Sequence, residues 1–532
     1  MEIDRYTTGS CIALLSLHHN TFISWTAVML ITSAWTKNSL SLQLLSEFFR
    51  FRFSPLLLHS TIMARTLKRK KILKKSKVKS KGASSSNPQQ NPAKVWQPGV
   101  DMINEGEELQ FDRSAYDCLH AFNVGWPCLS FDIIRDEQGL VRTGFPHSLY
   151  CVAGTQAEDA SSNSIGIVRL SNISGKKRNL VPMQSDDNES ESDSDSSSDE
   201  EDEDSKPVMQ LRMVAHQGCV NRIRSMMQEP HICATWGENG YVQVWDFRSH
   251  LNSLAASDPE VSTGACATIR QAPLHIFTGH KDEGYALDWS SITPGRLLSG
   301  DCKSCIHLWN PTSGGKWAID KEPFKGHSAS VEDLQWSPTE GDVFASCSVD
   351  GRVAIWDARV RNQPAVSVKA HNSDVNVISW NRLASCMIAS GSDDGSLSIW
   401  DLRSFKEDSF VAHFQYHKQP ITSIEWSPHE ASTLAVSSSD DQLTIWDLSL
   451  ERDAEEEAEF KAKLKQQADA PEDLPPQLLF VHQGQKSLKE LHWHGQIPGM
   501  LLSTAHDGFN VFIPSNVEMT LPELTGSLSK LG

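Results

Sequence analysis

The sequence lacks the short motifs that mark several classes of enzyme. It contains no G-x-x-x-x-G-K-[ST] loop, no G-x-S-x-G turn and no H-E-x-x-H helix. These patterns belong to phosphate-binding loops, serine hydrolases and zinc proteases. Neighbouring carboxylates are abundant, but they fall in acidic tracts where water solvates them. We therefore predict a protein that is not an enzyme, with no cofactor and no small-molecule substrate.

Long apolar runs and paired cysteines are also missing. The apolar stretches Ile12–Leu17 and Phe22–Trp35 are separated by polar residues, and neither reaches the roughly 18–20 residues that span a bilayer. We therefore expect no membrane partner. The 11 cysteines form no paired framework, which suits a reducing compartment. Cys302 and Cys305 form a C-x-x-C without a second ligand pair. This leaves a metal site or, as we favour, buried strand thiols.

Charge is unevenly distributed along the chain. The formal net charge is −18, whereas residues 1–100 hold 15 Lys/Arg and 3 Asp/Glu, a net of +12, so the remainder carries −30. A basic head on an acidic body predicts a basic protein partner or an electrostatic tether. The 532 residues, 39% of them hydrophobic, are ample for a large core.

A repeat occupies most of the chain. A histidine is followed by a tryptophan after 29 residues in five units, which open at His216, His280, His327, His371 and His417. In the unit from Gly326 to Arg359, three runs of alternating apolar and polar residues are separated by Pro and Gly turns. This pattern is typical of short antiparallel strands. One such unit cannot bury both of its faces, so it needs neighbours.

A step of about 45 residues, with histidine at the start and Trp-Asp at the end, resembles the WD-repeat β-propeller. The resemblance covers about residues 115–515. It implies an all-β, seven-bladed ring with a disordered basic N-terminal tail and acidic loop insertions. Six units open at His216 or later, and a seventh blade is expected upstream. Its strands are predicted at Leu129–Ile134, Ser148–Ala153, Ile165–Leu170 and Val208–Val214, with Asp117–Phe122 closing the ring against the last blade.

The same resemblance implies a hydrogen-bond chain within each blade, because buried polar groups need partners. In one unit the chain would link His327, Ser346 or Ser348, Asp350 and the indole of Trp356. The next units would use His371, Ser390 or Ser392, Asp394 and Trp400, then His417, Ser438, Asp440 and Trp446. Three units depart from this pattern, with Lys303 or Asn239 at the turn aspartate, or with Asp507 kept and Phe512 at the tryptophan position. We expect those blades to be less tightly tied.

Two further segments point to a family. Tyr116 to Phe131, YDCLHAFNVGWPCLSF, resembles the entry segment of the histone-binding WD subfamily that includes the retinoblastoma-binding and chromatin-assembly small subunits. Pro146 to Leu170 is more similar still to the glutamate-rich WD-repeat protein family. Members of that family are nucleolar and act in ribosome assembly and histone binding. The resemblance implies histones and a large-subunit ribosomal protein as partners, in the nucleus and nucleolus.

The N-terminal region divides at Met63, which begins MARTLKRKK and looks like a natural start. We predict that residues 1–62 are an upstream extension absent from the working protein; the alternative is a membrane or targeting role. Residues 63–100 are predicted to be a basic disordered tail and linker. Ten of the 17 residues from Arg65 to Lys81 are Lys or Arg, which favours a localisation signal over a merely solvated tail. RNA contact would use only this tail. The signal residues are Lys68, Arg69, Lys70, Lys71, Lys74 and Lys75.

An acidic loop is predicted at residues 185–205. Twelve acidic residues lie between Asp186 and Asp204, a composition that cannot form a packed core. It is either a flexible arm that shields basic clients or a solvated loop, and its charge density favours the arm. The proposed client-binding residues are Asp199, Glu200, Glu201, Asp202, Glu203 and Asp204. Acid-directed phosphorylation is predicted at Ser190, Ser192, Ser196, Ser197 and Ser198, each with an acid three positions later.

Other segments outside the strands are a candidate N-terminal helix at 101–114, insertions at 249–270 and 451–476, and a C-terminal tail at 516–532. The sequence PEDLPPQLLFVHQGQ, from Pro471 to Gln485, resembles a binding loop of the histone-binding subfamily. In that subfamily the loop and the N-terminal helix grip a basic histone helix. The matching positions are Glu472, Asp473, Leu474, Pro475 and Pro476.

The sequence W-D-x-R occurs three times and resembles the box by which some WD proteins dock the adaptor of a cullin-4 ubiquitin ligase. Its residues are Asp246, Arg248, Asp357, Arg359, Asp401 and Arg403. Arginine offers a planar fork of donors to carboxylates; alternatively, each arginine only neutralises the neighbouring aspartate. The main functional prediction is thus an escort of basic clients, and the alternative is a substrate receptor of a cullin-4 ligase.

Overall fold

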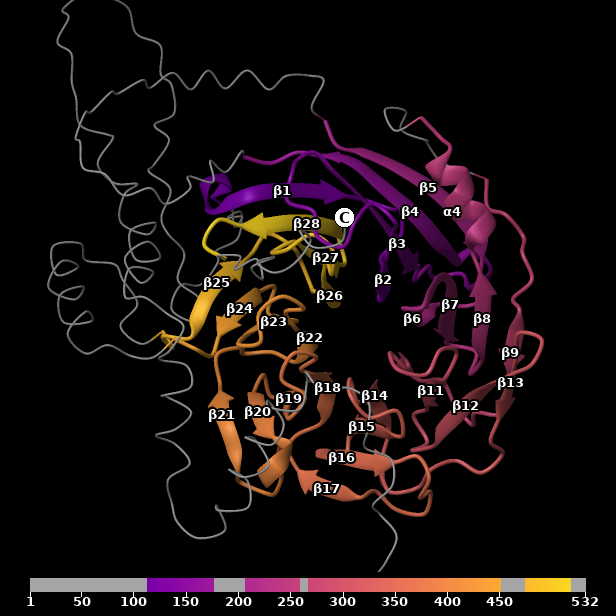
Figure 1. The fold of residues 1–532 in the computed structure, drawn as a ribbon, viewed down its shortest axis with the longest axis vertical. Coiled ribbons are helices and arrows are strands. Elements are labelled where there is room, and N and C mark those ends of the chain that lie inside the picture. Colours follow the sequence, from indigo (N-terminus) through magenta and orange to yellow (C-terminus); the bar gives the residue numbers. More distant parts are fainter. Residues whose placement is uncertain (1–111, 177–205, 259–266, 451–473, 518–532) are drawn as a thin grey trace, which may run out of the picture. The chain divides into compact units, whose positions relative to one another are not determined.

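The chain was studied as a computed structural model, which describes residues 112–176, 206–258, 267–450 and 474–517. The described residues contain seven sheets of four strands each. Figure 1 shows these sheets as blades that follow one another round a ring, from indigo and magenta through orange to yellow. The predicted all-β, seven-bladed propeller is therefore confirmed.

The blades are numbered in chain order, and the first strand of each is the innermost. Blade 1 contains β2 (Phe131–Ile134), β3 (His147–Gly154), β4 (Ser164–Ile173) and β5 (Val208–Ala215). Blade 2 contains β6 (Val220–Met226), β7 (Glu229–Gly237), β8 (Val242–Asp246) and β9 (His275–Phe277). Blade 3 contains β10 (Ala286–Trp289), β11 (Leu297–Gly300), β12 (Ile306–Thr312) and β13 (Lys316–Ile319). Blade 4 contains β14 (Val331–Trp336), β15 (Val343–Ser348), β16 (Arg352–Asp357) and β17 (Val366–Lys369).

The remaining blades complete the ring. Blade 5 contains β18 (Val375–Trp380), β19 (Met387–Ser392), β20 (Leu397–Asp401) and β21 (Phe410–Phe414). Blade 6 contains β22 (Ile421–Trp426), β23 (Thr433–Ser438), β24 (Leu443–Asp447) and β25 (Leu478–His482). Blade 7 contains β26 (Glu490–Trp493), β27 (Leu501–Ala505), β28 (Gly508–Pro514) and β1 (Tyr116–Phe122). The described helices are α4 (Arg248–Ala255) and the 3-10 turns η2 (Arg113–Ala115), η3 (Ala160–Ser162) and η5 (Leu402–Ser404). None of these described helices is long and apolar enough to cross a membrane.

Large apolar residues stack between the blades and form the core. On blade 4, Trp336 pairs with Phe344, and Phe344 pairs in turn with Trp356 on the third strand. All three are buried, and they share one cluster with Leu308 of blade 3. Because each face of a blade is covered by its neighbour, burial accounts for the apolar composition of both faces of the inner strands.

The ring closes through the first strand of the chain. Strand β1 pairs antiparallel with β28, so that His120 lies opposite Val511. Figure 1 shows the indigo β1 beside the yellow β28. The predicted closure by 117–122 and the predicted upstream blade are both confirmed. Closure pairs the edge that an open array would leave free, which suppresses pairing with other chains.

The predicted hydrogen-bond chain is complete in blade 4. His327 Nδ1 lies 3.0 Å from Asp350 Oδ2, its Nε2 lies 2.7 Å from Ser346 Oγ, and Trp356 donates its indole N–H to the same hydroxyl at 2.8 Å. Burial alone would raise the pKa of Asp350, but its hydrogen bond and charge interaction with His327 lower the pKa to about 2. The chain links the start, the middle and the end of one repeat.

In two other blades the predicted partner was wrong. His371 Nδ1 meets Ser396 Oγ at 2.8 Å instead of Asp394, whose carboxylate accepts from the Ser396 backbone N–H. In blade 6 the bridging hydroxyl belongs to Thr444, 2.9 Å from His417 Nε2, and not to Ser438. The reason is that Val436 occupies the place of the serine, so the hydroxyl comes from the paired residue of the next strand.

The three departing units behave differently from one another. Blade 3 was expected to be less tightly tied, which was wrong: Asp301, not the residue at 303, lies 3.1 Å from His280 Nδ1. Blade 2 has no carboxylate in its chain, because His216 Nδ1 bonds to the Gly218 carbonyl at 2.9 Å. In blade 7, His482 Nδ1 bonds to the Tyr116 hydroxyl at 2.8 Å, and the Asp507 carboxylate accepts from the Lys486 backbone N–H.

Several predictions concern residues outside the described ranges. These are the extension at 1–62, the tail at 63–100, the helix at 101–111, the acidic loop at 185–205 and the helix expected near 451–467. They include the localisation signal at 68–75 and the serines at 190–198. The first of the expected insertions begins with α4, which lies against β4, β5 and β7.

Candidate functional site: the central channel and its two mouths

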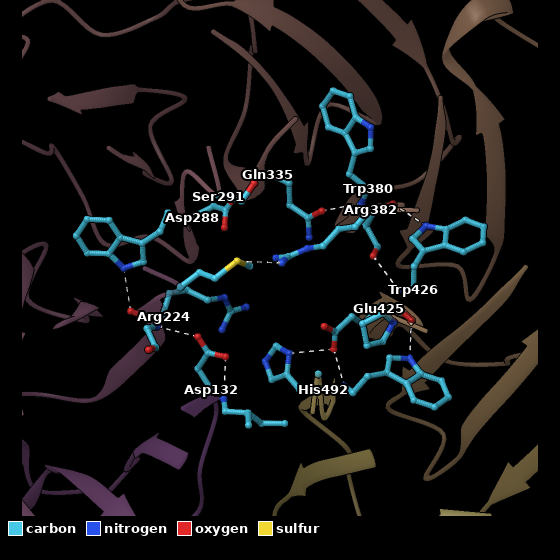
Figure 2. A pocket seen from close by; sticks show the side chains of 18 of the residues that line it. Asp132, Arg224, Asp288, Ser291, Gln335, Trp380, Arg382, Glu425, Trp426 and His492 are labelled. Carbon is cyan, nitrogen blue, oxygen red and sulfur yellow. Dashed lines mark hydrogen bonds and ion pairs between the residues drawn. The ribbon is translucent and has the colours of Figure 1, made fainter. Parts of the chain in front are cut away.

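The first strands all run from one end of the ring to the other. We call the end where they begin the upper face and the end where they finish the lower face. The repeat histidines lie at the upper face, because they directly precede the first strands. The inward side of the first strands lines a cavity of about 380 Å³ that opens at the lower face. This cavity is the candidate functional site (Figure 2).

A polar residue directly precedes a tryptophan at the lower end of five first strands. The pairs are Asp288-Trp289, Gln335-Trp336, Ser379-Trp380, Glu425-Trp426 and His492-Trp493. Alternation along a strand places such neighbours on opposite faces. The tryptophans are all buried, and each polar partner lines the cavity. One face of each strand therefore supports the ring, and the other supplies the channel.

The polar residues tie neighbouring blades together through the backbone. Asp288 accepts from the Trp336 N–H at 2.7 Å, and Asp333 accepts from the Ile378 N–H at 3.2 Å. Gln335, Ser379 and Glu425 accept in the same way from Trp380, Trp426 and Trp493. Buried backbone groups must be paired, so these side chains satisfy N–H groups that no strand faces.

Blade 2 interrupts the pattern with two arginines. Arg222 and Arg224 of β6 each reach Glu490 Oε1 of β26 at 2.7 Å. The other Glu490 oxygen accepts from Ser130 Oγ and from the Phe131 N–H. Burial alone would raise the pKa of Glu490, but Arg224, His492 and Arg222 hold the pKa well below its usual value. Three segments far apart in sequence thus share one buried ionised cluster.

His492 belongs to the same network. Its Nδ1 lies 3.1 Å from Glu425 Oε2, and its Nε2 lies 3.1 Å from the Phe131 carbonyl oxygen. Burial lowers its pKa, but the charge and hydrogen bond of Glu425, together with Glu490, overcome this and raise the pKa to about 10. The imidazole is therefore a fixed cation in the channel wall at neutral pH.

Asp288 is the exception among the channel acids. Burial raises its pKa to about 7, against the hydrogen bond from Trp336 and the charges of Arg382 and Arg224. Figure 2 shows Arg224 and Arg382 reaching into the pocket from opposite sides, with Asp132, Asp288, Glu425 and His492 around them. The lower part of the channel therefore has two guanidinium groups at its centre.

The upper mouth carries a row of acids on three consecutive blades. Glu283, Glu332 and Asp374 lie at or just before the starts of β10, β14 and β18. Burial and the charge of Asp374 contribute to a raised pKa of Glu332. Burial and the charge of Glu283 raise the pKa of Tyr285 to about 12. A concentration of negative charge therefore surrounds this end of the channel.

The W-D-x-R residues lie at the lower face, where the third strands end. Arg359 and Arg403 form close ion pairs with Asp357 and Asp401, each at 2.6 Å, and their side chains are 70% and 66% exposed. Arg248 instead begins α4, and its guanidinium lies 2.5 Å from His231 Nε2. The Asp246 carboxylate accepts from the Arg248 backbone N–H. Two of the three boxes thus present the same geometry.

The client-binding residues predicted from sequence are only partly described. Leu474 packs partly buried against the core between blades 5 and 6, and the Pro475 carbonyl accepts from the Leu478 N–H at 3.0 Å. Pro476 is half-buried. The acids at 472–473 and 199–204 lie outside the described residues. The described part of this loop leads directly into β25.

The sequence analysis did not single out the channel network. Its signal was available in the polar residue before each first-strand tryptophan, which alternation turns towards the ring centre. The pairing of Glu490 with two arginines had no local signal, because those residues are separated by more than 260 positions. Sequence reasoning could have listed the channel residues but not their partners.

Comparisons with known proteins agree with this architecture. A family model that describes the histone-binding protein RBBP4 and its counterpart in the CAF1 complex matches residues 106–174. The model "Nucleolar protein 10-like, N-terminal domain" matches residues 312–469. The chain is 64% identical over 467 residues to "Protein HEAT STRESS TOLERANT DWD 1" of Arabidopsis thaliana, with 86% of this chain and 99% of that protein covered.

Two further relatives are similar over most of their length. "Glutamate-rich WD repeat-containing protein 1" of Dictyostelium discoideum is 55% identical, covering 80% of this chain and 86% of that protein. "Ribosome assembly protein rrb1" of Schizosaccharomyces pombe is 42% identical, covering 79% and 85%. The repeats, the closed ring and the polar channel define a WD-repeat propeller. Within that class, the chain belongs to the glutamate-rich WD-repeat protein family.

Proposed function

We propose that this chain binds and escorts basic proteins in ribosome assembly and chromatin, in the nucleus and nucleolus, and that it is not an enzyme. The observation that carries the proposal is the acidic row of Glu283, Glu332 and Asp374 at the upper mouth. Clustered carboxylates attract Lys- and Arg-rich chains and speed their capture. The names of the relatives and of the matching family models, which refer to ribosome assembly and to histone binding, support the same classes of client.

The predicted acidic arm and the loop at 472–476 belong to this proposal. Residues 199–204 would add a dense negative charge to a client that the upper mouth holds. Phosphorylation of the serines at 190–198 would increase that charge further. The basic run at 68–75 would direct the chain to the compartment where such clients are assembled.

Binding of purified core histones and of a basic large-subunit ribosomal protein tests the proposal. We expect affinity to fall steeply with salt, because charge neutralisation drives association. Glu332→Gln with Asp374→Asn should weaken binding about tenfold, in the range expected for the loss of charged contacts. Glu340→Gln, on the first turn of the lower face, is the matched control and should bind like the unaltered protein. Equal affinity at low and high salt would refute an electrostatic escort.

A second function is favoured by the geometry of two W-D-x-R boxes. We propose that Arg359 and Arg403 dock the adaptor of a cullin-4 ligase, since each is exposed and held by its own aspartate. The name of the Arabidopsis relative contains the term DWD. Arg359→Ala with Arg403→Ala should abolish adaptor capture and leave histone binding intact. Arg361→Ala, which removes a nearby arginine paired with Asp320, is the control. Unchanged adaptor capture by the double variant would refute this function.

A further inference from the structure

The lower mouth of the channel carries two arginines without acidic partners. Arg135 follows β2 and Arg382 follows β18, and both side chains are exposed and line the cavity. Within the described ranges, no carboxylate lies within ion-pair distance of either guanidinium. The Arg382 guanidinium makes one polar contact, 4.0 Å from the Met227 sulfur. Most of its donors are therefore available to a ligand.

The acids of the channel are already occupied by the protein itself. Asp132 accepts from the backbone N–H groups of Ile133 and Ser225. Asp333 likewise accepts from those of Leu334 and Ile378. Glu425 and Glu490 are held by His492 and by the arginines of β6, as described above. The groups left over at the lower mouth are thus mainly donors, and a donor-rich mouth fits an acceptor.

Two buried N–H groups in the cavity wall add to this excess. The indole Nε1 of Trp336 has no acceptor in the described structure, although the residue is 4% exposed. His494 Nδ1 accepts from the N–H groups of Gln496 and Ile497, which places the proton on Nε2. That Nε2 also has no partner. An unpaired buried donor is costly, and a bound acceptor would relieve it.

An apolar rim surrounds this mouth. Leu140 is 72% exposed, Leu383 52% and Met227 39%, and each lies on or beside a residue that lines the cavity. Ile292, next to the lining residue Ser291, is 42% exposed. They come from the first turns of four different blades. Exposed apolar residues grouped about a polar hollow are typical of a protein interaction site.

We propose that the lower mouth binds an acidic peptide segment of a partner protein, in which carboxylates alternate with apolar side chains. A carboxylate of the peptide accepts from Arg382 and Arg135, and its apolar neighbours rest on Leu140 and Leu383. Asp288 does not oppose this strongly, because burial raises its pKa to about 7 and reduces its negative charge. The site goes beyond the proposed escort function: it lies on the opposite face from the acidic row and takes a ligand of opposite charge.

Fluorescence anisotropy with the full chain and a fluorescein-labelled peptide that alternates glutamate and leucine tests the proposal. We expect saturable binding that weakens with added salt. Arg382→Gln and Arg135→Gln should each lower the affinity about tenfold, as for the loss of a charge-assisted hydrogen bond. Leu140→Ser with Leu383→Ser should lower it further. Both arginines are exposed, so these variants are expected to fold, which an unchanged thermal midpoint would verify.

Matched controls separate the contributions. Lys321→Gln removes an exposed cation beyond the end of β13 and should bind the peptide normally. A peptide with glutamine in place of glutamate should not bind, and Glu332→Gln with Asp374→Asn should leave peptide binding intact while weakening histone binding. No binding of the glutamate–leucine peptide, or equal binding by the two arginine variants, overturns the proposal. Displacement of the peptide by single-stranded RNA, with the same dependence on Arg382 and Arg135, would assign the mouth to a phosphate backbone and also overturn it.

Discussion

The indole N–H of Trp446 donates to the hydroxyl of Thr444 at 2.8 Å, and both residues lie on β24. The same hydroxyl lies 2.9 Å from His417 Nε2. In blades 4 and 5 a serine of the second strand performs this role. The hydrogen-bond chain thus keeps its geometry from blade to blade although its hydroxyl comes from a different strand.

Thr444→Val should destabilise blade 6. The substitution keeps the shape of the side chain but leaves the Trp446 and His417 nitrogens buried without a partner. We expect a loss of about 2 kcal/mol in the free energy of unfolding, measured by urea denaturation. Thr433→Val is the control, since its buried hydroxyl makes no described hydrogen bond within the protein. Equal losses in the two variants would show that the Thr444 hydroxyl has no special role.

Two tryptophans at equivalent positions should respond differently to loss of the indole N–H. Trp426 donates to the Ser379 carbonyl of the preceding blade at 2.9 Å, whereas Trp336 has no acceptor among the described residues. Both are buried to a similar extent, so replacement by phenylalanine leaves similar cavities. We expect Trp426→Phe to cost about 1 kcal/mol more than Trp336→Phe, because the Ser379 carbonyl loses its donor. Chemical denaturation measures this difference, and a larger loss for Trp336→Phe would contradict it.

The protonated state of His492 should stabilise the ring. Its pKa in the folded protein is raised from 6.5 to about 10. A raised folded pKa adds stability that is fully present below about 6.5 and is lost as the pH rises through about 10. His492→Gln should therefore flatten the fall of the thermal midpoint over this window. His506→Gln, at an exposed turn, serves as the control. An unchanged alkaline profile in His492→Gln would exclude this residue as the source.

Asp350 should contribute in the opposite direction of pH. Its pKa in the folded protein is lowered from 3.8 to about 2, chiefly through His327 against the effect of burial. A lowered folded pKa adds stability that is present above about 3.8 and is lost as the pH falls to about 2. Asp350→Asn should cost roughly 1 kcal/mol at neutral pH, allowing for solvent screening, and progressively less in acid. Denaturation midpoints across this range give the comparison. A cost that does not shrink in acid would show that the carboxylate charge is not its origin.

Much of the architecture was predictable because the relevant information is local. The spacing from His327 to Trp356 and its repetition gave the period, and alternation of apolar and polar residues gave strands such as 331–336 and 343–348. A unit with two apolar faces must stack on neighbours, so the ring followed from the count of units. The closing strand at 116–122 was placed by the same reasoning.

Partners that depend on side-chain position could not be predicted in this way. Asp301 and Ser396 reach their histidines although the expected residues were at 303 and 394, because small changes in a turn decide which oxygen arrives. The client-binding and adaptor-docking residues remain predictions, since their function depends on partners that the sequence does not contain.

The amino-acid sequence by itself determined the repeat, the strands and the number of blades, because these depend on spacing and on the burial of apolar faces. Only the tertiary structure decided which charged groups meet at the centre. Arg222, Arg224 and Glu490 stand on strands of blades 2 and 7 and form ion pairs at 2.7 Å. Closure of the ring removes them from water together, and at that short distance their attraction outweighs the cost of burying each charge alone.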